Sequence, residues 1–174
     1  MSEEAKALAA FRKKEVRALS RFISRAEDRD PTLYPVLAEL FSETGKANVI
    51  GITGPPGAGK SSLVNAFVKF AREEKKSVAV IAVDPVSPFT GGALLGDRIR
   101  LLDHFNDPNV YIRSLSTRGK LGGLSLATRE VVHLADAYGF DYVLIETVGV
   151  GQSEVDIRNL ADLTLVVQIG RAHV

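Results

Sequence analysis

Apolar residues in the first part of the chain recur at the spacing of one helix face, with Lys and Arg between them. The repeated positions are Leu8, Phe11, Leu19, Phe22 and Ile23. This pattern predicts a helix over about 4–28. Asp30 and Pro31 then provide an N-cap and a first helical residue. We expect a second helix to about Ser42, closed near Gly45.

Residues 1–45 are therefore predicted to form an N-terminal helical extension. We expect it to pack on the main domain with a solvated outer face. Docking to a partner protein is the alternative interpretation.

The pattern changes after this extension, because short apolar runs alternate with helical patterns. The runs predict strands over about 48–53, 78–83, 110–115, 142–146 and 163–167. Helices are expected over about 61–74, 94–105 and 124–138. Continuous apolar strands separated by helices are typical of a parallel sheet covered on both faces. We expect an α/β, doubly wound, mostly parallel sheet over 46–168, with ligands at the carboxyl ends of its strands.

The amino-acid composition argues against several classes of protein. The chain has 174 residues with 22 Lys and Arg against 21 Asp and Glu, a net charge of +1. This balance does not favour nucleic acid or an anionic membrane as a partner. Cysteine is absent, which excludes thiolate metal sites. With no apolar run near the ~20 residues that cross a bilayer, and no secretory signal pattern, a cytoplasmic protein is expected.

The last six residues, 169–174, are predicted to be a non-native read-through tail. They can be encoded by the beginning of a common sequencing adapter, and the buried strand before them should lead into a further loop and helix. On this hypothesis the natural sequence departs from this one near Val167. A true C-terminus is the alternative. An interrupted sheet is also expected to leave an aggregation-prone edge.

A phosphate-binding motif follows the first predicted strand and opens the next helix. Residues 54–61 read GPPGAGKS, which fits G-x-x-x-x-G-K-[ST]. Its glycines let backbone N–H groups approach phosphate oxygens. Lys60 is expected to reach the β- and γ-phosphates as a catalytic contact, and the Ser61 hydroxyl to hold Mg²⁺. The predicted nucleotide-binding residues in this segment are Gly54, Pro55, Pro56, Gly57, Ala58, Gly59, Lys60, Ser61 and Ser62.

Three carboxylates are candidates for a magnesium site. Asp84 and Glu146 end predicted strands, and Asp97 lies in a glycine-rich connection. Mg²⁺ prefers oxygen ligands and retains several waters. A turn before Pro85 is the alternative role for Asp84, and helix capping is the alternative for Asp97. Glu146 is the strongest candidate, because a carboxylate that ends a buried strand needs compensation.

A glycine-rich segment over 149–154 follows Glu146 directly. An amide of Gly149 or Gly151 is expected to contact the γ-phosphate, and Gln152 to orient the attacking water. Capping of a helix from about Glu154 is the alternative. Arg113, with Arg118 and Lys120, is expected to be a solvated surface residue or to neutralise phosphate charge. His104 and His133 are interpreted as ordinary helix residues.

Four segments together resemble the methylmalonyl-CoA mutase-associated GTPases, which are also labelled arginine/ornithine transport ATPases or kinases. They are GITGPPGAGKS at 51–61, AVDPVSPFTGG at 82–92, TRGKLGGL at 117–124 and ETVGVGQSE at 146–154. The resemblance covers about 17–167. It implies a P-loop GTPase that acts as a chaperone, gating cofactor loading and protection of an adenosylcobalamin-dependent mutase.

The resemblance also carries roles to single positions. It implies phosphate and Mg²⁺ contacts at Lys60 and Ser61, and magnesium-site acids at Asp84, Asp97 and Glu146. It implies bound GTP or GDP, and a homodimer when the protein is full length. The guanine-specifying motif and the dimerisation arm of the family would lie beyond Val167, so the chain is expected to be C-terminally truncated. An ATP-dependent small-molecule or protein kinase is the main alternative. Nickel delivery and a non-enzymatic binding fragment are further alternatives.

Overall fold

The computed structural model describes residues 2–84, 104, 106–116, 123–147 and 157–170. Its five strands are all parallel and lie in the order β3-β2-β4-β1-β5. The strands are β1 (Asn48–Thr53), β2 (Val78–Asp84), β3 (Val110–Ser116), β4 (Tyr142–Thr147) and β5 (Leu163–Val166). The predicted parallel α/β sheet is confirmed.

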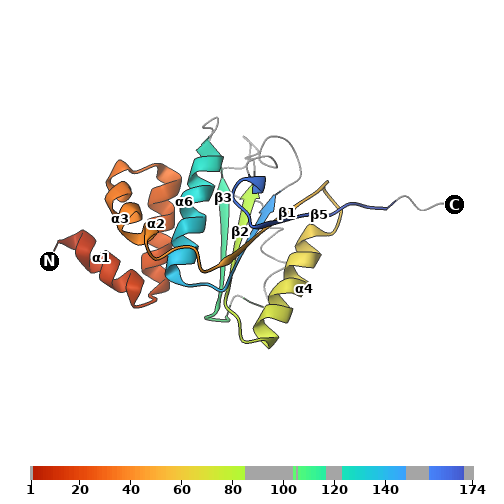
Figure 1. Ribbon diagram of the computed structural model, residues 1–174, viewed down its shortest axis with the longest axis horizontal. Helices are drawn as coiled ribbons and strands as arrows, with labels where there is room; N and C mark the ends of the chain where they lie inside the picture. Colours follow the sequence, from red (N-terminus) through yellow and green to blue (C-terminus); the bar gives the residue numbers. More distant parts are fainter. Residues whose placement is uncertain (1, 85–103, 105, 117–122, 148–156, 171–174) are drawn as a thin grey trace.

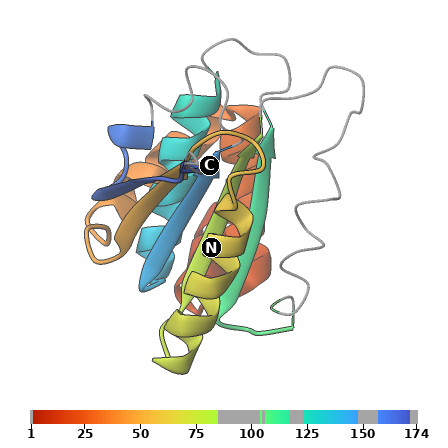
Figure 2. The same ribbon diagram turned by 90° about the vertical axis from the view of Figure 1, so that its right-hand side faces the viewer.

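Helices cover both faces of this sheet (Figure 1). α4 (Lys60–Glu73) lies on one face and buries Val64, Val68 and Ala71 against it. Figure 2 shows α4 in front of the strands in that view. α6 (Gly123–Tyr138) lies on the opposite face, where Val131 and Leu134 are buried. This arrangement follows from the strand sequences, because runs such as 78–83 carry apolar side chains toward both faces.

The N-terminal segment is divided more finely than its periodicity predicts. It forms α1 (Glu3–Arg12), α2 (Val16–Asp28), the 3₁₀ turn η1 (Pro31–Leu33) and α3 (Tyr34–Phe41). The expectation of one helix over 4–28 is wrong, because Lys14 has a φ of 63° and its N–H donates to the Phe11 carbonyl. The predicted cap is confirmed, since the Asp30 carboxylate accepts from the backbone N–H of Thr32.

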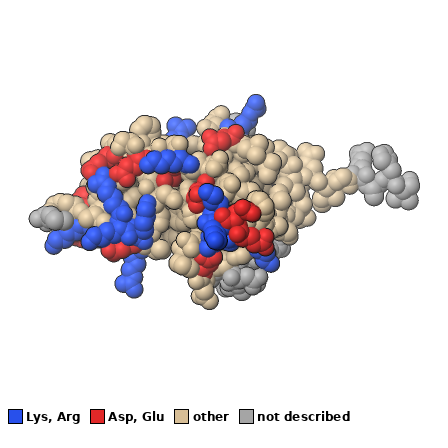
Figure 3. Space-filling model, turned by 60° about the horizontal axis from the view of Figure 1, so that its bottom comes forward, with Lys and Arg blue, Asp and Glu red and all other residues tan. Residues whose placement is uncertain are grey.

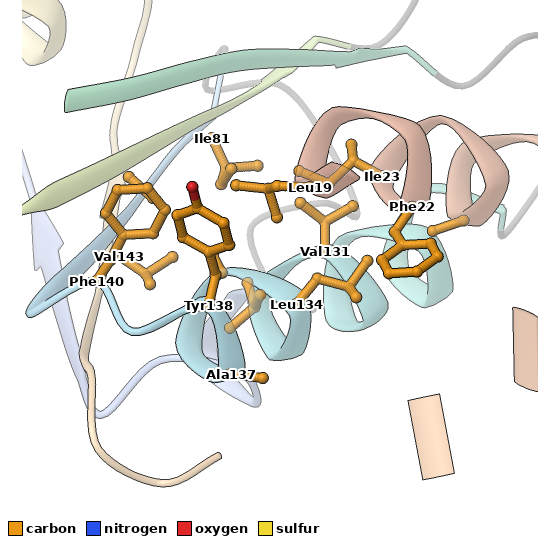
Figure 4. Packing of buried hydrophobic residues seen from close by; sticks show 14 of the residues in the cluster. Leu19, Phe22, Ile23, Ile81, Val131, Leu134, Ala137, Tyr138, Phe140 and Val143 are labelled. Atoms are coloured by element: carbon orange, nitrogen blue, oxygen red, sulfur yellow. The ribbon is translucent and has the colours of Figure 1, made fainter. Parts of the chain in front are cut away.

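The N-terminal helices share a hydrophobic core with the sheet. Leu19, Phe22 and Ile23 of α2 are fully buried and pack in one cluster with residues of α6 and of the strands (Figure 4). The Phe11 ring contacts the rings of Phe22 and Tyr138, at centroid distances of 5.5 and 5.3 Å. α6 therefore packs against both the sheet and the N-terminal helices (Figure 1), while α2 also contacts the sheet directly.

Polar contacts also join α2 to strand β3. The Arg113 guanidinium donates to the Glu27 carboxylate and to the Ser24 hydroxyl. Only 4% of the Glu27 side chain and 25% of the Arg113 side chain are exposed. Arg113 was expected either to be solvated at the surface or to neutralise phosphate charge. Both expectations are wrong, because its guanidinium is paired with Glu27 between α2 and β3.

Surface charges of opposite sign lie side by side over the N-terminal helices (Figure 3). Ion pairs join Arg12 to Glu43 and Arg21 to Glu3, with N–O distances of 2.7 and 2.9 Å. Exposed pairs of this kind contribute only about 0–1 kcal/mol each. The buried apolar contacts with α6, rather than these pairs, hold the extension in place.

Strand β5 pairs with β1 and has no second neighbour among the described strands. Leu163 and Val166 on it are 53% and 59% exposed. The helix expected over 94–105 lies outside the described residues except at His104, which is buried with its Nε2 3.0 Å from Asn65 Oδ1. Among the described helices, none combines the length and apolar character that crossing a membrane requires.

Candidate nucleotide-binding site

The connection from β1 to α4 forms a glycine-rich loop at the carboxyl edge of the sheet. Gly54, Gly57 and Gly59 have φ values of 138°, 78° and 95°. L-residues with a side chain rarely adopt these backbone conformations. Gly59 is the N-cap of α4, so the loop residues stand directly at the positive end of that helix. The loop therefore has the backbone form and the helix dipole that favour a bound anion.

Gly54 is further restricted by the chain after β5. The Val167 N–H donates to the Thr53 carbonyl at 2.8 Å. A Cβ on Gly54 would lie 2.0 Å from the Val167 carbonyl oxygen. A glycine is required here for space as well as for φ, because a backbone atom cannot move aside as a flexible side chain can.

Lys60, the lysine of the motif, has its ammonium inside the loop. Its Nζ donates to the carbonyls of Gly54 and Pro55, at 2.7 and 3.0 Å. Only 7% of the residue is exposed. The loop carbonyls therefore hold a positive charge at the place where the motif predicts phosphate oxygens.

Ser61 and Glu146, which are 85 positions apart in sequence, meet at this edge. The Ser61 hydroxyl donates to Glu146 Oε1 at 2.7 Å. β4 lies beside β1, and Glu146 is in register with Ile52, which carries the carboxylate to the first turn of α4. The structure thus brings two of the predicted magnesium-site residues into contact.

Of the remaining predicted site residues, the structure describes only the backbone of Asp84. Asp84 ends β2 one residue beyond the Val83–Thr147 pair, so its backbone lies at the same edge of the sheet. Asp97, Gly149 and Gln152 lie outside the described residues, as do Arg118 and Lys120. Within the described ranges, no group of three or more His, Cys, Asp or Glu side chains could hold a metal ion.

Three aspartates that the motif analysis did not single out accept backbone N–H groups at the opposite, amino edge of the sheet. Asp136 accepts from Gly45, Lys46 and Ala47, at 2.5, 3.1 and 2.9 Å. Asp141 accepts from Ser77 N and Asp162 from Val49 N, both at 2.8 Å. The Ser77 N–H is the main cause that lowers the pKa of Asp141. These acids stabilise the strand starts, and no motif distinguishes them in the sequence.

A buried pair of threonines is the second feature that sequence reasoning missed. Thr147 Oγ1 donates to Thr53 Oγ1 at 3.1 Å, and 1% and 6% of these residues are exposed. Thr53 precedes the glycine-rich loop, and Thr147 follows Glu146. The sequence offered one signal for this hydrogen bond: the two threonines lie at, or directly after, the ends of predicted strands that a parallel sheet could place side by side.

A strand, a glycine-rich loop with an inward lysine, a helix that begins at that lysine, and an acid on the neighbouring strand define a P-loop nucleoside-triphosphatase fold. Residues 17–173 match the family described as Methylmalonyl Co-A mutase-associated GTPase MeaB. The chain belongs to this family.

Individual relatives agree with this assignment. A Pyrococcus horikoshii protein that is named as a GTPase is 52% identical over 159 residues, which are 91% of this chain and 50% of the relative. Escherichia coli GTPase ArgK is 38% identical over 169 residues, which are 95% of this chain and 51% of the relative. A crystal structure titled LAO/AO transport system kinase is similar with a TM-score of 0.74 and 30% identity, over 97% of this chain and 51% of that chain. The chain thus spans about half the length of these relatives.

Proposed function

We propose that this chain is the phosphate-binding part of a GTPase that hydrolyses the γ-phosphate of GTP with Mg²⁺. The observation that carries the proposal is the contact of 2.7 Å between Ser61 and Glu146 beside the 54–59 loop, in a chain of the mutase-associated GTPase family. The same edge of the sheet presents the loop, the lysine and the carboxylate together.

The donors at this edge fit a magnesium ion. Ser61 Oγ and Glu146 Oε1 are hard oxygen ligands of the kind that Mg²⁺ prefers. Asp84 and Asp97 are the further proposed ligands, directly or through water. When bound, Mg²⁺ supplies positive charge to the oxygens of the β- and γ-phosphates.

The chain's own residues would supply binding and positioning. The loop N–H groups over 57–62 and the Lys60 ammonium would bind the phosphates, for which Lys60 must exchange its carbonyl partners for phosphate oxygens. Gly149 is proposed to contact the γ-phosphate through its amide, and Gln152 to orient the attacking water. Catalysis of this kind is mostly positioning and charge stabilisation.

The wider role is proposed from the family. We infer that the full protein gates cofactor loading and protects an adenosylcobalamin-dependent acyl-CoA mutase of the methylmalonyl-CoA type. The family description, which names association with that mutase, supports this role. A homodimer of the full-length protein and a cytoplasmic location belong to the same proposal.

Base preference tests the GTP assignment. We expect the gene product extended past Val167 to bind GDP more tightly than ADP by at least about tenfold, which is about 1.4 kcal/mol. The measurement is calorimetric titration of each nucleotide with Mg²⁺ present. Equal affinities, or a preference for ADP, would contradict the assignment.

A kinase is the second candidate, because the similar solved structure is titled a transport system kinase. A kinase needs an acceptor other than water for the γ-phosphate. Incubation of the extended gene product with γ-labelled GTP and ATP separates the two functions. Label recovered only as inorganic phosphate favours the GTPase, and label transferred to a protein or metabolite favours the kinase.

A further inference from the structure

The carboxyl ends of β1 and β4 are joined on both faces of the sheet. On the α4 face, Ile52 and Leu144 are buried with Val64 and Val68. Side chains alternate along a strand, so Glu146 points to this face, where it meets Ser61. Thr53 and Thr147 point to the other face, on which Val143 and Ile145 are buried in the α6 cluster. The contact of 3.1 Å between their hydroxyls therefore lies behind the Ser61–Glu146 contact.

This second contact sits at the point where both strands leave the sheet. Thr53 is the last residue of β1 before the phosphate-binding loop, and Thr147 is the last residue of β4. The backbone pairing of these two strands ends at Ile52 and Glu146, one residue earlier. Beyond that pair, the side-chain hydroxyls continue the connection between the strand ends.

We propose that the Thr147–Thr53 hydrogen bond is a positioning contact, which fixes the end of β4 against β1 so that the Glu146 carboxylate meets the Ser61 hydroxyl. The inference rests on the proposed function, because it assigns Thr147 a part in magnesium-dependent nucleotide binding. Thr147 acts through Glu146 and touches no substrate.

The burial of the pair supports this role. Replacing Thr147 by Val keeps the shape of the side chain and removes the hydroxyl that donates to Thr53. The Thr53 hydroxyl then loses its partner in a buried place, which favours a shift of the strand end toward a new arrangement. Glu146 is the neighbouring residue, so such a shift moves its carboxylate first.

The test uses the gene product extended past Val167, with Thr147→Val, Thr147→Ser and a control, Thr44→Val. Thr44 also donates one hydrogen bond, to the Phe41 carbonyl at 2.8 Å, but lies in the turn after α3, away from the strand ends. Mg²⁺ is titrated at a fixed concentration of fluorescent GDP. We expect Thr147→Val to raise the Mg²⁺ concentration for half-maximal binding about tenfold. GDP affinity in EDTA should change less than about twofold. Thr147→Ser should restore the wild-type value, and the control should not change it.

An unchanged Mg²⁺ requirement in Thr147→Val would overturn the proposal, and so would an equal shift in Thr44→Val. A crystal structure of Thr147→Val gives an independent readout without nucleotide. We expect the Ser61–Glu146 distance to exceed about 3.5 Å, the limit of a hydrogen bond. An unchanged contact would also overturn the inference. If wild type failed to bind GDP while the contact was lost in the variant, the positioning role would stand and the proposed function would fail.

Discussion

Gly54 is the residue at which the end of β1, the phosphate-binding loop and the backbone after β5 meet. Its φ is 138°, and an added Cβ would lie 2.0 Å from the Val167 carbonyl oxygen, which leaves no room for a side chain. A glycine is therefore needed at position 54 for two reasons. Its backbone has a positive φ, and the backbone at Val167 passes too close for a side chain.

Replacing Gly54 by Ala should lower the free energy of unfolding by more than about 2 kcal/mol, because it combines backbone strain with a backbone clash. It should also weaken GDP binding. Urea denaturation checks the first expectation. Gly45→Ala is the matched control, since Gly45 has a φ of 87° but a Cβ there meets nothing within 4 Å. Equal stabilities of the two variants would refute the steric account.

At the scale of elements, α3 packs on α6 through an aromatic contact. The Phe41 ring lies edge-on against the His133 ring, with centroids 5.6 Å apart. Burial is the main cause that lowers the pKa of His133, and the nearby Arg129 adds to it. Protonation of this histidine is thus less favourable in the folded state than in the unfolded chain.

This lowered pKa of His133 makes stability depend on pH in one direction. Below the unfolded pKa of about 6.5, the unfolded chain binds a proton at His133 more readily than the folded protein, so stability falls as the pH falls. We expect His133→Gln to flatten the decline in unfolding free energy between about pH 7 and pH 5. Urea titrations of both proteins at the two pH values measure this. Parallel declines would show that His133 makes no such contribution.

Helices and strands were predicted correctly from the sequence where a single hydrophobic pattern runs through the whole element. The continuous apolar run over 78–83 predicted a buried strand, and β2 (Val78–Asp84) confirms it. The break at Lys13 and Lys14 was missed because the apolar spacing of α1 and α2 continues across it. That turn depends on tertiary contacts: Lys14 Nζ donates to the Tyr138 carbonyl, and the Tyr138 hydroxyl donates to the Lys14 carbonyl. The two residues are 124 positions apart, so local sequence could not indicate these contacts.

Across the whole molecule, the polar side chains at the two edges of the sheet make different kinds of contact. The amino edge carries Asp136, Asp141 and Asp162, which accept backbone N–H groups. The carboxyl edge carries the loop, Lys60, Ser61 and Glu146. Motif spacing and the carboxyl-edge rule predicted that Ser61 and Glu146 would lie together. The same reasoning could not distinguish the amino-edge aspartates, because their partners are backbone groups.

The N-terminal extension shows another limit of sequence reasoning. Its packing on the main domain was predicted and is confirmed, but the residues that it contacts were not, because amphipathic spacing does not say which side chains cover a helix. In the structure, Phe22 and Ile23 join one cluster with Ile81 and Val143 of the sheet (Figure 4). The helices therefore stabilise the same core that supports the phosphate-binding edge.

Binding of a nucleotide's phosphates by the 54–61 segment is tested by calorimetric titration of GDP with Mg²⁺ into the gene product extended past Val167 and into its Lys60→Ala variant. We expect the wild type to bind GDP and the variant to bind it at least about tenfold more weakly, a loss of about 1.4 kcal/mol. Equal binding by the two proteins would contradict it, because Lys60 would then have no part in holding the phosphates.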